Sequence, residues 1–255
     1  MKKSSRRKFI KSAAISGILA PFVTPVFAID KSKQAYQKSI IQSNEKDNYL
    51  EIIKNELGKQ WPKNRAINLV FHGHSVPSGY FKTPEVRSLQ SYPFLLLKDL
   101  KEIYPYAVIN IILTSIGGEN SKQGAMRFEN QVLNHNPDVL FIDYALNDVG
   151  IGLAASRSAW ESMIKAALER NCKIVLLTAT PDQRIDLLNT ESNLQKICTQ
   201  IVALSNEYQI GIVDNYKAFQ KIVSSSEKIT DYMSQVNHPN EKGHQLVVDG
   251  IMKYF

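Results

Sequence analysis

The sequence has few cysteines, no long hydrophobic run and no internal repeat. Only two cysteines, Cys172 and Cys198, occur among 255 residues. Two cysteines cannot form the disulfide framework that supports small secreted domains, and a chain of this length can bury a core without one. We therefore expect both to be buried small apolar residues, with a single disulfide as the alternative.

The positive charge of the chain is concentrated at its amino terminus. The chain carries 31 basic and 24 acidic residues, a net charge of +7, and residues 1–28 contain six of the basic residues and none of the acidic ones. The remainder therefore has 25 basic and 24 acidic residues, a net charge of +1. Without a basic surplus there is no electrostatic reason to expect nucleic acid or an anionic membrane as a partner.

The first 28 residues have the pattern of an export signal. A basic start is followed by a short apolar stretch, Ala13 to Val23, and then by Val26-Phe27-Ala28, with small residues where a signal peptidase cuts. We expect cleavage after Ala28 and no stable membrane insertion, because the apolar stretch is too short to span a bilayer. The segment Ser5-Arg6-Arg7-Lys8-Phe9 resembles a twin-arginine signal, and an ordinary Sec signal is the alternative. The mature protein is expected in the periplasm or outside the cell.

The rest of the chain predicts a lead-in helical segment, residues 29–62, and one α/β domain, residues 63–255. Apolar runs alternate with helical patterns of a dozen or more residues, which indicates βαβ units, a parallel sheet and a three-layer sandwich. The expected strands are Ala66 to Phe71, Ala107 to Leu113, Val139 to Ala145, Lys173 to Thr178 and Ile210 to Val213. Helices are expected near 92–103, 121–134, 157–170 and 191–208. A short helix is expected to end at Val223, and a last helix to cover 240–254.

Polar residues that can carry ester chemistry follow these strands. Ser75, Gly117 and Asn147 come after the first three strands, and His238 comes just before the last helix. The carboxyl ends of parallel strands meet at one edge of a sheet, so these residues are expected to converge. An ester hydrolase needs a nucleophile, a base within hydrogen-bond reach and donors for the oxyanion. Each residue taken alone is better explained as a turn, helix-cap or helix-entry residue, and only the combination indicates catalysis.

The four segments resemble the sequence blocks of the SGNH (GDSL-like) hydrolase superfamily. The blocks are Gly73-His74-Ser75, Ser115-Ile116-Gly117, Leu146-Asn147-Asp148 and Asn237-His238-Pro239-Asn240, in the family's order. The resemblance implies a flavodoxin-like α/β/α fold with five parallel strands in the order 2-1-3-4-5. It also implies that Ser75 is the nucleophile and His238 the general base. The oxyanion donors would be Ser75, Gly117 and Asn147.

Three positions depart from the family pattern. His74 occupies the usual place of an aspartate and Ala145 that of a glycine, while Gln235 replaces the acid three residues before the histidine. Such an acid holds the histidine tautomer and stabilises the imidazolium. The Gln235 carbonyl or a backbone carbonyl could hold the tautomer without supplying charge, and Asp231 is poorly placed to substitute. We therefore expect a Ser-His dyad, with His74 as a loop-stabilising residue.

Other polar residues have more than one interpretation. His72 and His74 could hold a metal together with His238, but no carboxylate cluster accompanies them, so we expect neither a metal nor a cofactor. His135 and His244 are expected on helix surfaces. Loop residues Arg87, Glu119 and Arg184 could contact substrate or be solvated.

Taken together, the sequence predicts an exported serine esterase that acts on short acyl or acetyl esters, on a small molecule or a polysaccharide. One alternative is a carbohydrate-binding protein of the same fold with weakened catalysis, suggested by Gln235. Others are a lipase or lysophospholipase-type hydrolase, or metal-assisted hydrolysis. The oligomeric state is left open.

Overall fold

The computed structural model describes residues 48–225 and 227–255, which belong to one compact unit. The predicted export signal, residues 1–28, and residues 29–47 of the predicted lead-in segment lie outside the described residues. Within the described ranges, no helix is both long enough and apolar enough to cross a membrane.

A five-stranded parallel sheet forms the centre of the fold. The strands pair in the order β2-β1-β3-β4-β5, which confirms the predicted flavodoxin-like α/β/α fold. They are β1 (Ala66–Gly73), β2 (Val108–Leu113), β3 (Val139–Asp143), β4 (Lys173–Leu177) and β5 (Gly211–Val213). Because all strands run in the same direction, their carboxyl ends lie along one edge, where a site is expected.

The central strands carry apolar runs because both faces of the sheet are covered. Alternate side chains point to opposite faces. In β3, Leu140 and Ile142 pack into the core cluster on one face, whereas Val139 and Phe141 pack into the cluster on the other. This two-sided burial explains why the sequence shows unbroken apolar runs rather than an alternating pattern.

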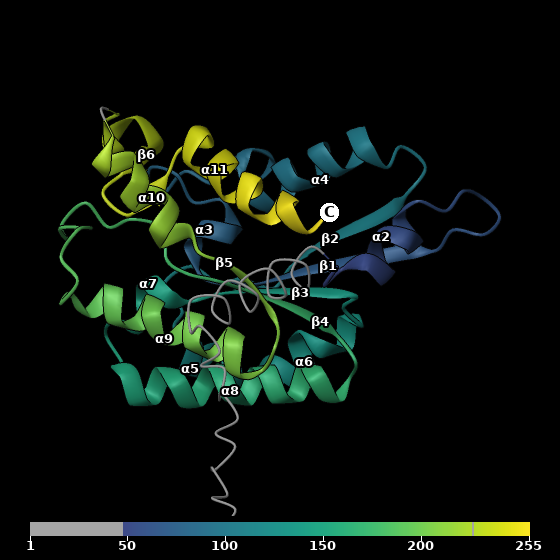
Figure 1. Cartoon of the computed structure of the whole chain (residues 1–255), viewed down its shortest axis with the longest axis horizontal. Coiled ribbons are helices and arrows are strands. Elements are labelled where there is room, and N and C mark those ends of the chain that lie inside the picture. The colour runs from purple at the N-terminus through teal and green to yellow at the C-terminus, as the bar shows by residue number, and fades with distance from the viewer. Residues whose placement is uncertain (1–47, 226) are drawn as a thin grey trace, which may run out of the picture. The chain divides into compact units, whose positions relative to one another are not determined.

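Helices form the two outer layers (Figure 1). Helices α4 and α11 pack against each other on one side of the sheet, and α5, α8 and α9 pack together on the other. The longer helices are α2 (Glu51–Leu57), α4 (Tyr92–Ile103), α5 (Ser121–Met126), α8 (Leu153–Glu169), α9 (Asn193–Glu207), α10 (Asn215–Ser224) and α11 (Glu241–Ile251). The one-turn helices are α3 (Ser75–Ser78), α6 (Phe128–Gln131) and α7 (Ala145–Asp148), and short 3-10 turns cover 88–90, 133–135, 229–232 and 252–254.

The structure differs from the sequence predictions in local detail. The helix expected over 121–134 is broken at Arg127 into α5 and α6. The sequence did not predict the one-turn helices α3 and α7, nor the antiparallel pair β6 (Met233–Gln235) and β7 (His238–Pro239). The last helix was predicted correctly, including its cap, because the Asn240 side chain accepts the Gly243 N–H. Cys172 and Cys198 are buried and unpaired, which confirms the expectation of two buried apolar residues over the alternative of a disulfide.

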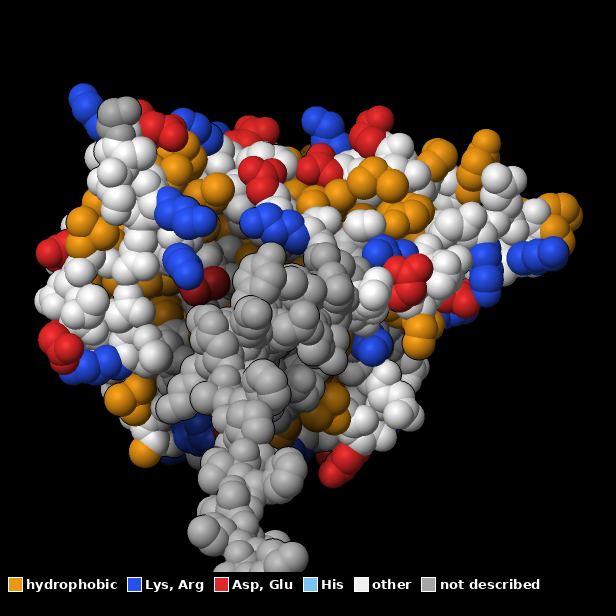
Figure 2. All heavy atoms as spheres, viewed as in Figure 1, with side chains coloured by type: hydrophobic (Ala, Val, Ile, Leu, Met, Phe, Trp, Pro, Cys, Tyr) orange, Lys and Arg blue, Asp and Glu red, His pale blue; other side chains and the backbone are white. Residues whose placement is uncertain are grey.

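The surface carries charges of both signs. On the face seen in Figure 2, basic and acidic side chains are interspersed. Elsewhere among the described residues, opposite charges form ion pairs such as Arg157 with Glu161 and Glu207. The visible face therefore has no single-sign field of the kind that attracts polyanions, in agreement with the nearly balanced charge beyond residue 28.

Candidate active site

Ser75 lies where β1 passes directly into α3. The turn is tight: a Cβ on Gly73 would lie 2.5 Å from the Asp143 carbonyl oxygen and 2.9 Å from Pro77. His74 is the cap of α3, and its Nδ1 accepts the N–H of Val76 at 3.3 Å. Pro77 has no N–H, so the cap leaves the Ser75 N–H as the first-turn donor without a helical acceptor. The Ser75 side chain is partly exposed at this corner.

His238 meets Ser75 from the opposite end of the sequence. The His238 Nε2 lies 2.9 Å from the Ser75 Oγ, which is hydrogen-bond distance for a nucleophile and its base. The β6–β7 pair positions the ring, and the Ser234 hydroxyl donates to the carbonyls of His238 and Pro239. The structure thus brings together two predicted site residues that are 163 positions apart.

The other ring nitrogen of His238 faces no carboxylate in the part of the chain that the structure describes. Nδ1 lies 2.9 Å from the Phe81 carbonyl oxygen and 2.7 Å from the Gln235 Nε2. An N–H at Nδ1 can donate to the Phe81 carbonyl, and this tautomer leaves Nε2 free to accept the Ser75 proton. The Gln235 amide N–H favours the other tautomer, because it can donate only to an unprotonated Nδ1. Of the acceptors considered from the sequence, the backbone carbonyl is therefore the one in place.

The Gln235 amide is held by the loop that follows α3. Its Oε1 accepts the Thr83 N–H at 3.0 Å, and its Nε2 lies 3.2 Å from the Thr83 Oγ1. The carbonyl oxygen of the amide is therefore engaged by Thr83 rather than by His238. The acid considered as a poor substitute, Asp231, lies on the exposed 3-10 turn before β6.

Burial lowers the pKa of His238 and so favours its neutral form. Loss of hydration lowers its pKa below the ordinary histidine value of 6.5, and the nearby His74 lowers the pKa further. The hydrogen bond to the Phe81 carbonyl acts in the opposite direction and raises the pKa. A neutral imidazole with a free Nε2 is the form that can accept a proton.

Gly117 and Asn147 follow β2 and β3, the two strands that flank β1, at the same edge of the sheet. Gly117 belongs to the exposed loop between β2 and α5, and its missing side chain leaves room for the Tyr80 ring, 3.1 Å from where a Cβ would be. The loop is tied to the nucleophile turn, because the Ile116 N–H donates to the Gly73 carbonyl. Asn147 projects from α7, and one hydrogen of its amide goes to the Glu119 carbonyl at 2.8 Å. The second amide hydrogen remains available for a ligand.

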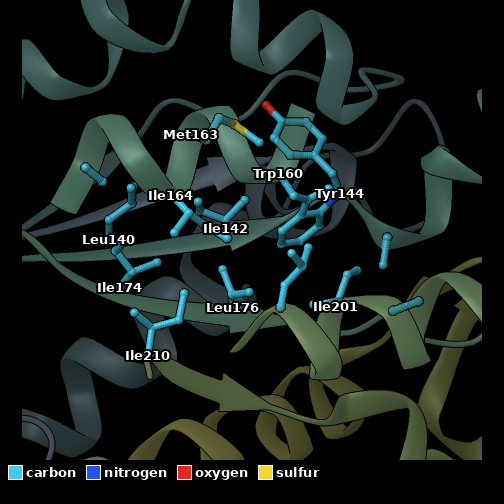
Figure 3. Packing of buried hydrophobic residues seen from close by; sticks show 14 of the residues in the cluster. Leu140, Ile142, Tyr144, Trp160, Met163, Ile164, Ile174, Leu176, Ile201 and Ile210 are labelled. Carbon is cyan, nitrogen blue, oxygen red and sulfur yellow. The ribbon is translucent and has the colours of Figure 1, made fainter. Parts of the chain in front are cut away.

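Asp148 anchors the short helix that carries Asn147. Its fully buried carboxylate accepts the Ser121 N–H at 2.8 Å, the Ser156 hydroxyl at 2.7 Å and the Trp160 Nε1–H at 2.7 Å. Figure 3 shows Trp160 and Tyr144 at one end of the core cluster, away from Leu140 and Ile174. One carboxylate therefore joins α5, α7 and α8 beneath the site.

His72 and His74, the two histidines that precede Ser75, contact different neighbours. His74 is fully buried, with its Nε2 3.4 Å from the Asp143 Oδ1, and Asp143 also accepts the Tyr92 hydroxyl at 3.2 Å. His72 points to the other face of the sheet, where its ring contacts Thr114 and Tyr144. No cluster of three or more metal-ligating side chains occurs among residues 48–225 and 227–255.

Two expectations about individual residues were wrong. His244 is fully buried rather than on a helix surface: its Nδ1 accepts the Tyr92 N–H and its ring stacks on Phe81 at 5.2 Å. Glu119 is buried and paired with Arg127, so it is neither solvated nor free for substrate. Exposed His135 follows the prediction, while Arg87 and Arg184 pair with neighbouring acids, Glu85 and Asp182.

Sequence reasoning missed several residues that shape the site. Phe81 acts through its backbone carbonyl, Thr83 through its N–H, and Arg127 and Tyr144 through buried contacts described below. A backbone contact leaves no mark on the residue type. The sequence carried no signal for Arg127, because the residue lies in a stretch whose pattern predicts one continuous helix, and the structure breaks that helix at this residue.

Comparison with known proteins assigns the family. A model of the GDSL-like Lipase/Acylhydrolase family matches residues 71–246, more than half of the chain. The chain belongs to this family. As a member it is a carboxylic ester hydrolase of the SGNH type, and no curated protein matches it.

Solved structures share the fold at low sequence identity. A two-domain esterase active on acetylated mannans is 20% identical with a TM-score of 0.64, over 80% of this chain and 51% of that one. The chain thus spans about half of that two-domain protein. Axe2, an acetylxylan esterase from Geobacillus stearothermophilus, is 18% identical with a TM-score of 0.65, over 74% of this chain and 93% of that one. A protein described as a GDSL-like lipase from Parabacteroides merdae is 20% identical with a TM-score of 0.64, over 74% and 94%.

Proposed function

We propose that the protein is an exported serine esterase that removes short acyl groups, acetyl in particular, from carbohydrate. The observation that carries the proposal is the 2.9 Å contact between the Ser75 Oγ and the His238 Nε2 at the carboxyl edge of the sheet. This geometry lets the imidazole accept the hydroxyl proton while the oxygen attacks a carbonyl carbon.

The reaction proceeds in two steps. The Ser75 Oγ attacks the ester carbonyl, His238 takes the proton, and the Ser75 and Gly117 N–H groups together with the Asn147 amide stabilise the oxyanion. The tetrahedral intermediate collapses as the imidazolium protonates the leaving alcohol, which leaves an acyl-serine. Water, activated by the neutral imidazole, then attacks the acyl-serine, and the acid and free Ser75 are released.

The Phe81 carbonyl orients the base in this mechanism. By accepting the Nδ1–H at 2.9 Å, it favours the tautomer in which Nε2 faces Ser75 without a proton. A neutral carbonyl supplies less stabilisation to the imidazolium than a carboxylate does. We therefore expect a Ser-His dyad with lower turnover than a full triad would give.

Carbohydrate acetyl esters are the substrate class that the structural relatives favour. One relative is described as active on acetylated mannans and another as an acetylxylan esterase. Their identity to this chain is 20% or less, so they support a substrate class to be tested rather than a particular sugar.

Three measurements on one protein preparation test the proposal. Wild-type protein should hydrolyse p-nitrophenyl acetate faster than the octanoate, release acetate from acetylated xylo- or manno-oligosaccharides, and react with a fluorophosphonate probe. Ser75→Ala should retain the fold by circular dichroism and lose all three. Preference for octanoate would instead indicate a lipase-type hydrolase. Sugar binding without probe labelling would indicate the weakened carbohydrate-binding protein, and chelator-sensitive turnover independent of Ser75 would indicate metal-assisted hydrolysis.

Export is the second part of the proposal, and it rests on the first 28 residues alone. Replacing Arg6 and Arg7 together with lysine should keep the precursor inside the cell if the twin-arginine route is used. Unchanged export of that variant would indicate the Sec route.

A further inference from the structure

The proposed oxyanion donors Gly117 and Asn147 come from different strand ends, and an ion pair between buried Glu119 and partly buried Arg127 connects their segments. The Arg127 guanidinium donates to the Thr114 carbonyl through Nη2 at 2.6 Å. It also contacts both carboxylate oxygens of Glu119, Nε to Oε1 at 2.7 Å and Nη2 to Oε2. Thr114 and Glu119 are the two ends of the loop that carries Gly117, so one side chain holds both ends.

Glu119 extends this connection to Asn147. Its main-chain carbonyl accepts the Asn147 amide at 2.8 Å, and its Oε2 accepts the Tyr144 hydroxyl at 2.6 Å. Tyr144 immediately precedes α7, the one-turn helix that contains Asn147. Glu119 therefore belongs to the Gly117 loop and is also joined by two hydrogen bonds to Asn147 and to the residue that precedes its helix.

Neutral His72 completes the network from beneath. Burial lowers its pKa to about 4, and the nearby Arg127 charge adds to this effect. A neutral ring can donate from Nε2 to the Tyr144 oxygen at 3.1 Å and accept at Nδ1 from the Thr114 hydroxyl at 3.0 Å. Gly124 makes the approach possible, because a Cβ there would collide with the Tyr144 hydroxyl.

The loop needs this support because it has little packing of its own. Ile116, Gly117 and Gly118 are exposed, whereas Glu119 is 8% exposed. Bidentate arginine–carboxylate pairs are strong and geometrically specific. Oxyanion donors act only if they are held where the charge develops.

Resting on the serine esterase mechanism proposed above, we propose that the Arg127–Glu119 pair is a clamp that sets the position of Gly117 relative to Asn147. The pair touches neither substrate nor the reacting atoms, so Arg127 and Glu119 are positioning residues. Its removal should impair stabilisation of the transition state more than binding of the substrate.

The test is a mutant cycle between the clamp and the donor that it positions. The double variant Glu119→Gln/Arg127→Met removes both charges, so that neither is left buried without a partner. With p-nitrophenyl acetate we expect kcat to fall about tenfold and KM to change less than about twofold. In an Asn147→Ala background the same double substitution should lower kcat by only about threefold or less, because one of the two donors whose relative position the pair sets is already gone.

A matched ion pair at the opposite edge of the sheet provides the control. Arg65 makes two hydrogen bonds to the Asp138 carboxylate, at 2.8 and 3.1 Å, where β1 and β3 begin. Arg65→Met should leave kcat and KM unchanged. If thermal denaturation shows no folding transition for the Glu119→Gln/Arg127→Met protein, the same mutant cycle is measured with Arg127→Lys. This substitution keeps the charge but not the bidentate contact.

The outcomes separate the clamp from the function on which it rests. An equal loss of kcat in the wild-type and Asn147→Ala backgrounds, or no loss at all, overturns the clamp. A wild-type protein without Ser75-dependent turnover overturns the proposed function and the clamp with it.

Discussion

The oxyanion side and the base side of the candidate site are held in place by different kinds of chemical group. On the oxyanion side, the segments of Gly117 and Asn147 are held by buried or partly buried charged groups, the Arg127–Glu119 pair and the Asp148 carboxylate. On the base side, the His238 ring contacts a backbone carbonyl and a neutral amide. Fixed charge thus supports the donors rather than the base, and the two sides should respond differently to substitution.

The largest effect should come from breaking the base side completely. His238→Ala removes the proton acceptor 2.9 Å from the Ser75 Oγ, and kcat for p-nitrophenyl acetate should fall by a factor of about 10³ or more. Ser75→Ala measured alongside should lose about as much, because the two residues act as a unit. Turnover by His238→Ala within about tenfold of wild type would show that another group is the base.

Removing a donor from the oxyanion side should have the next largest effect. Asn147→Ala deletes one proposed donor, and we expect kcat to fall by a factor of about 10² to 10³ with little change in KM. Asn134→Ala is a control, because Asn134 is exposed and its side-chain amide, within residues 48–225 and 227–255, donates to the Asn130 carbonyl alone. A rise in KM with unchanged kcat would place Asn147 in substrate binding instead.

Adding charge to the base side should make the two sides more alike. Gln235→Glu is nearly isosteric: one oxygen can keep the Thr83 N–H, and the other takes the place of Nε2, 2.7 Å from Nδ1. A carboxylate there stabilises the imidazolium, so we expect kcat to rise about tenfold.

The pH profile of Gln235→Glu gives a second readout. The wild-type His238 pKa is lowered, chiefly by burial, so wild-type activity should persist below pH 6.5 and decline only at more acidic pH. The added carboxylate raises that pKa, and activity should then be lost at a higher pH as the solution is acidified. Gln183→Glu, which adds a charge nearby without facing Nδ1, is the control. An acid limb at the same pH in wild type and Gln235→Glu would contradict the proposed contact.

The smallest effect concerns stability in acid, where both sides carry a buried neutral histidine. Burial lowers the pKa of His72, beneath the oxyanion side, to about 4 and that of His244, behind Phe81, to about 3. In the unfolded chain both histidines have the ordinary pKa near 6.5, so below that pH the unfolded chain binds more protons than the folded protein does. The free energy of unfolding should therefore be unaffected by these two histidines above pH 6.5 and should decrease as the pH drops toward 4 and 3.

The variant His244→Asn isolates one of these histidines. An asparagine oxygen can still accept the Tyr92 N–H, which His244 Nδ1 accepts at 3.2 Å, but it cannot titrate. Between pH 7 and 5, urea denaturation should show a loss of unfolding free energy that is about 1–2 kcal/mol smaller in the variant than in wild type. Equal losses would show that His244 does not contribute.

The fold was predictable because its strands are buried on both faces. Apolar runs such as Val139 to Phe141 and Ile174 to Leu177 indicate central strands of a covered sheet, and the strand order followed from the family resemblance. The residues at the strand ends were likewise found from their motifs, and the structure brings Ser75 and His238 together.

The supporting contacts were not predictable, for physical reasons. The Glu119–Arg127 pair forms across the break between α5 and α6, and a helical pattern of residues alone does not reveal that break. The burial of His244 depends on Phe81 and Tyr92, which are more than 150 positions away. The contact from Phe81 to His238 involves atoms that every residue possesses.

That last contact has a consequence for how the site can vary. A triad acid can be lost through a single codon change, whereas the carbonyl at position 81 is present whichever residue is encoded there. Substitution at position 81 therefore acts through the ring, which stacks on His244 and lies beneath the Arg87 guanidinium, and replacing Phe81 with leucine or tyrosine leaves the acceptor in place. An alanine scan would miss this partner of the base, and only a change to the main chain itself can remove it.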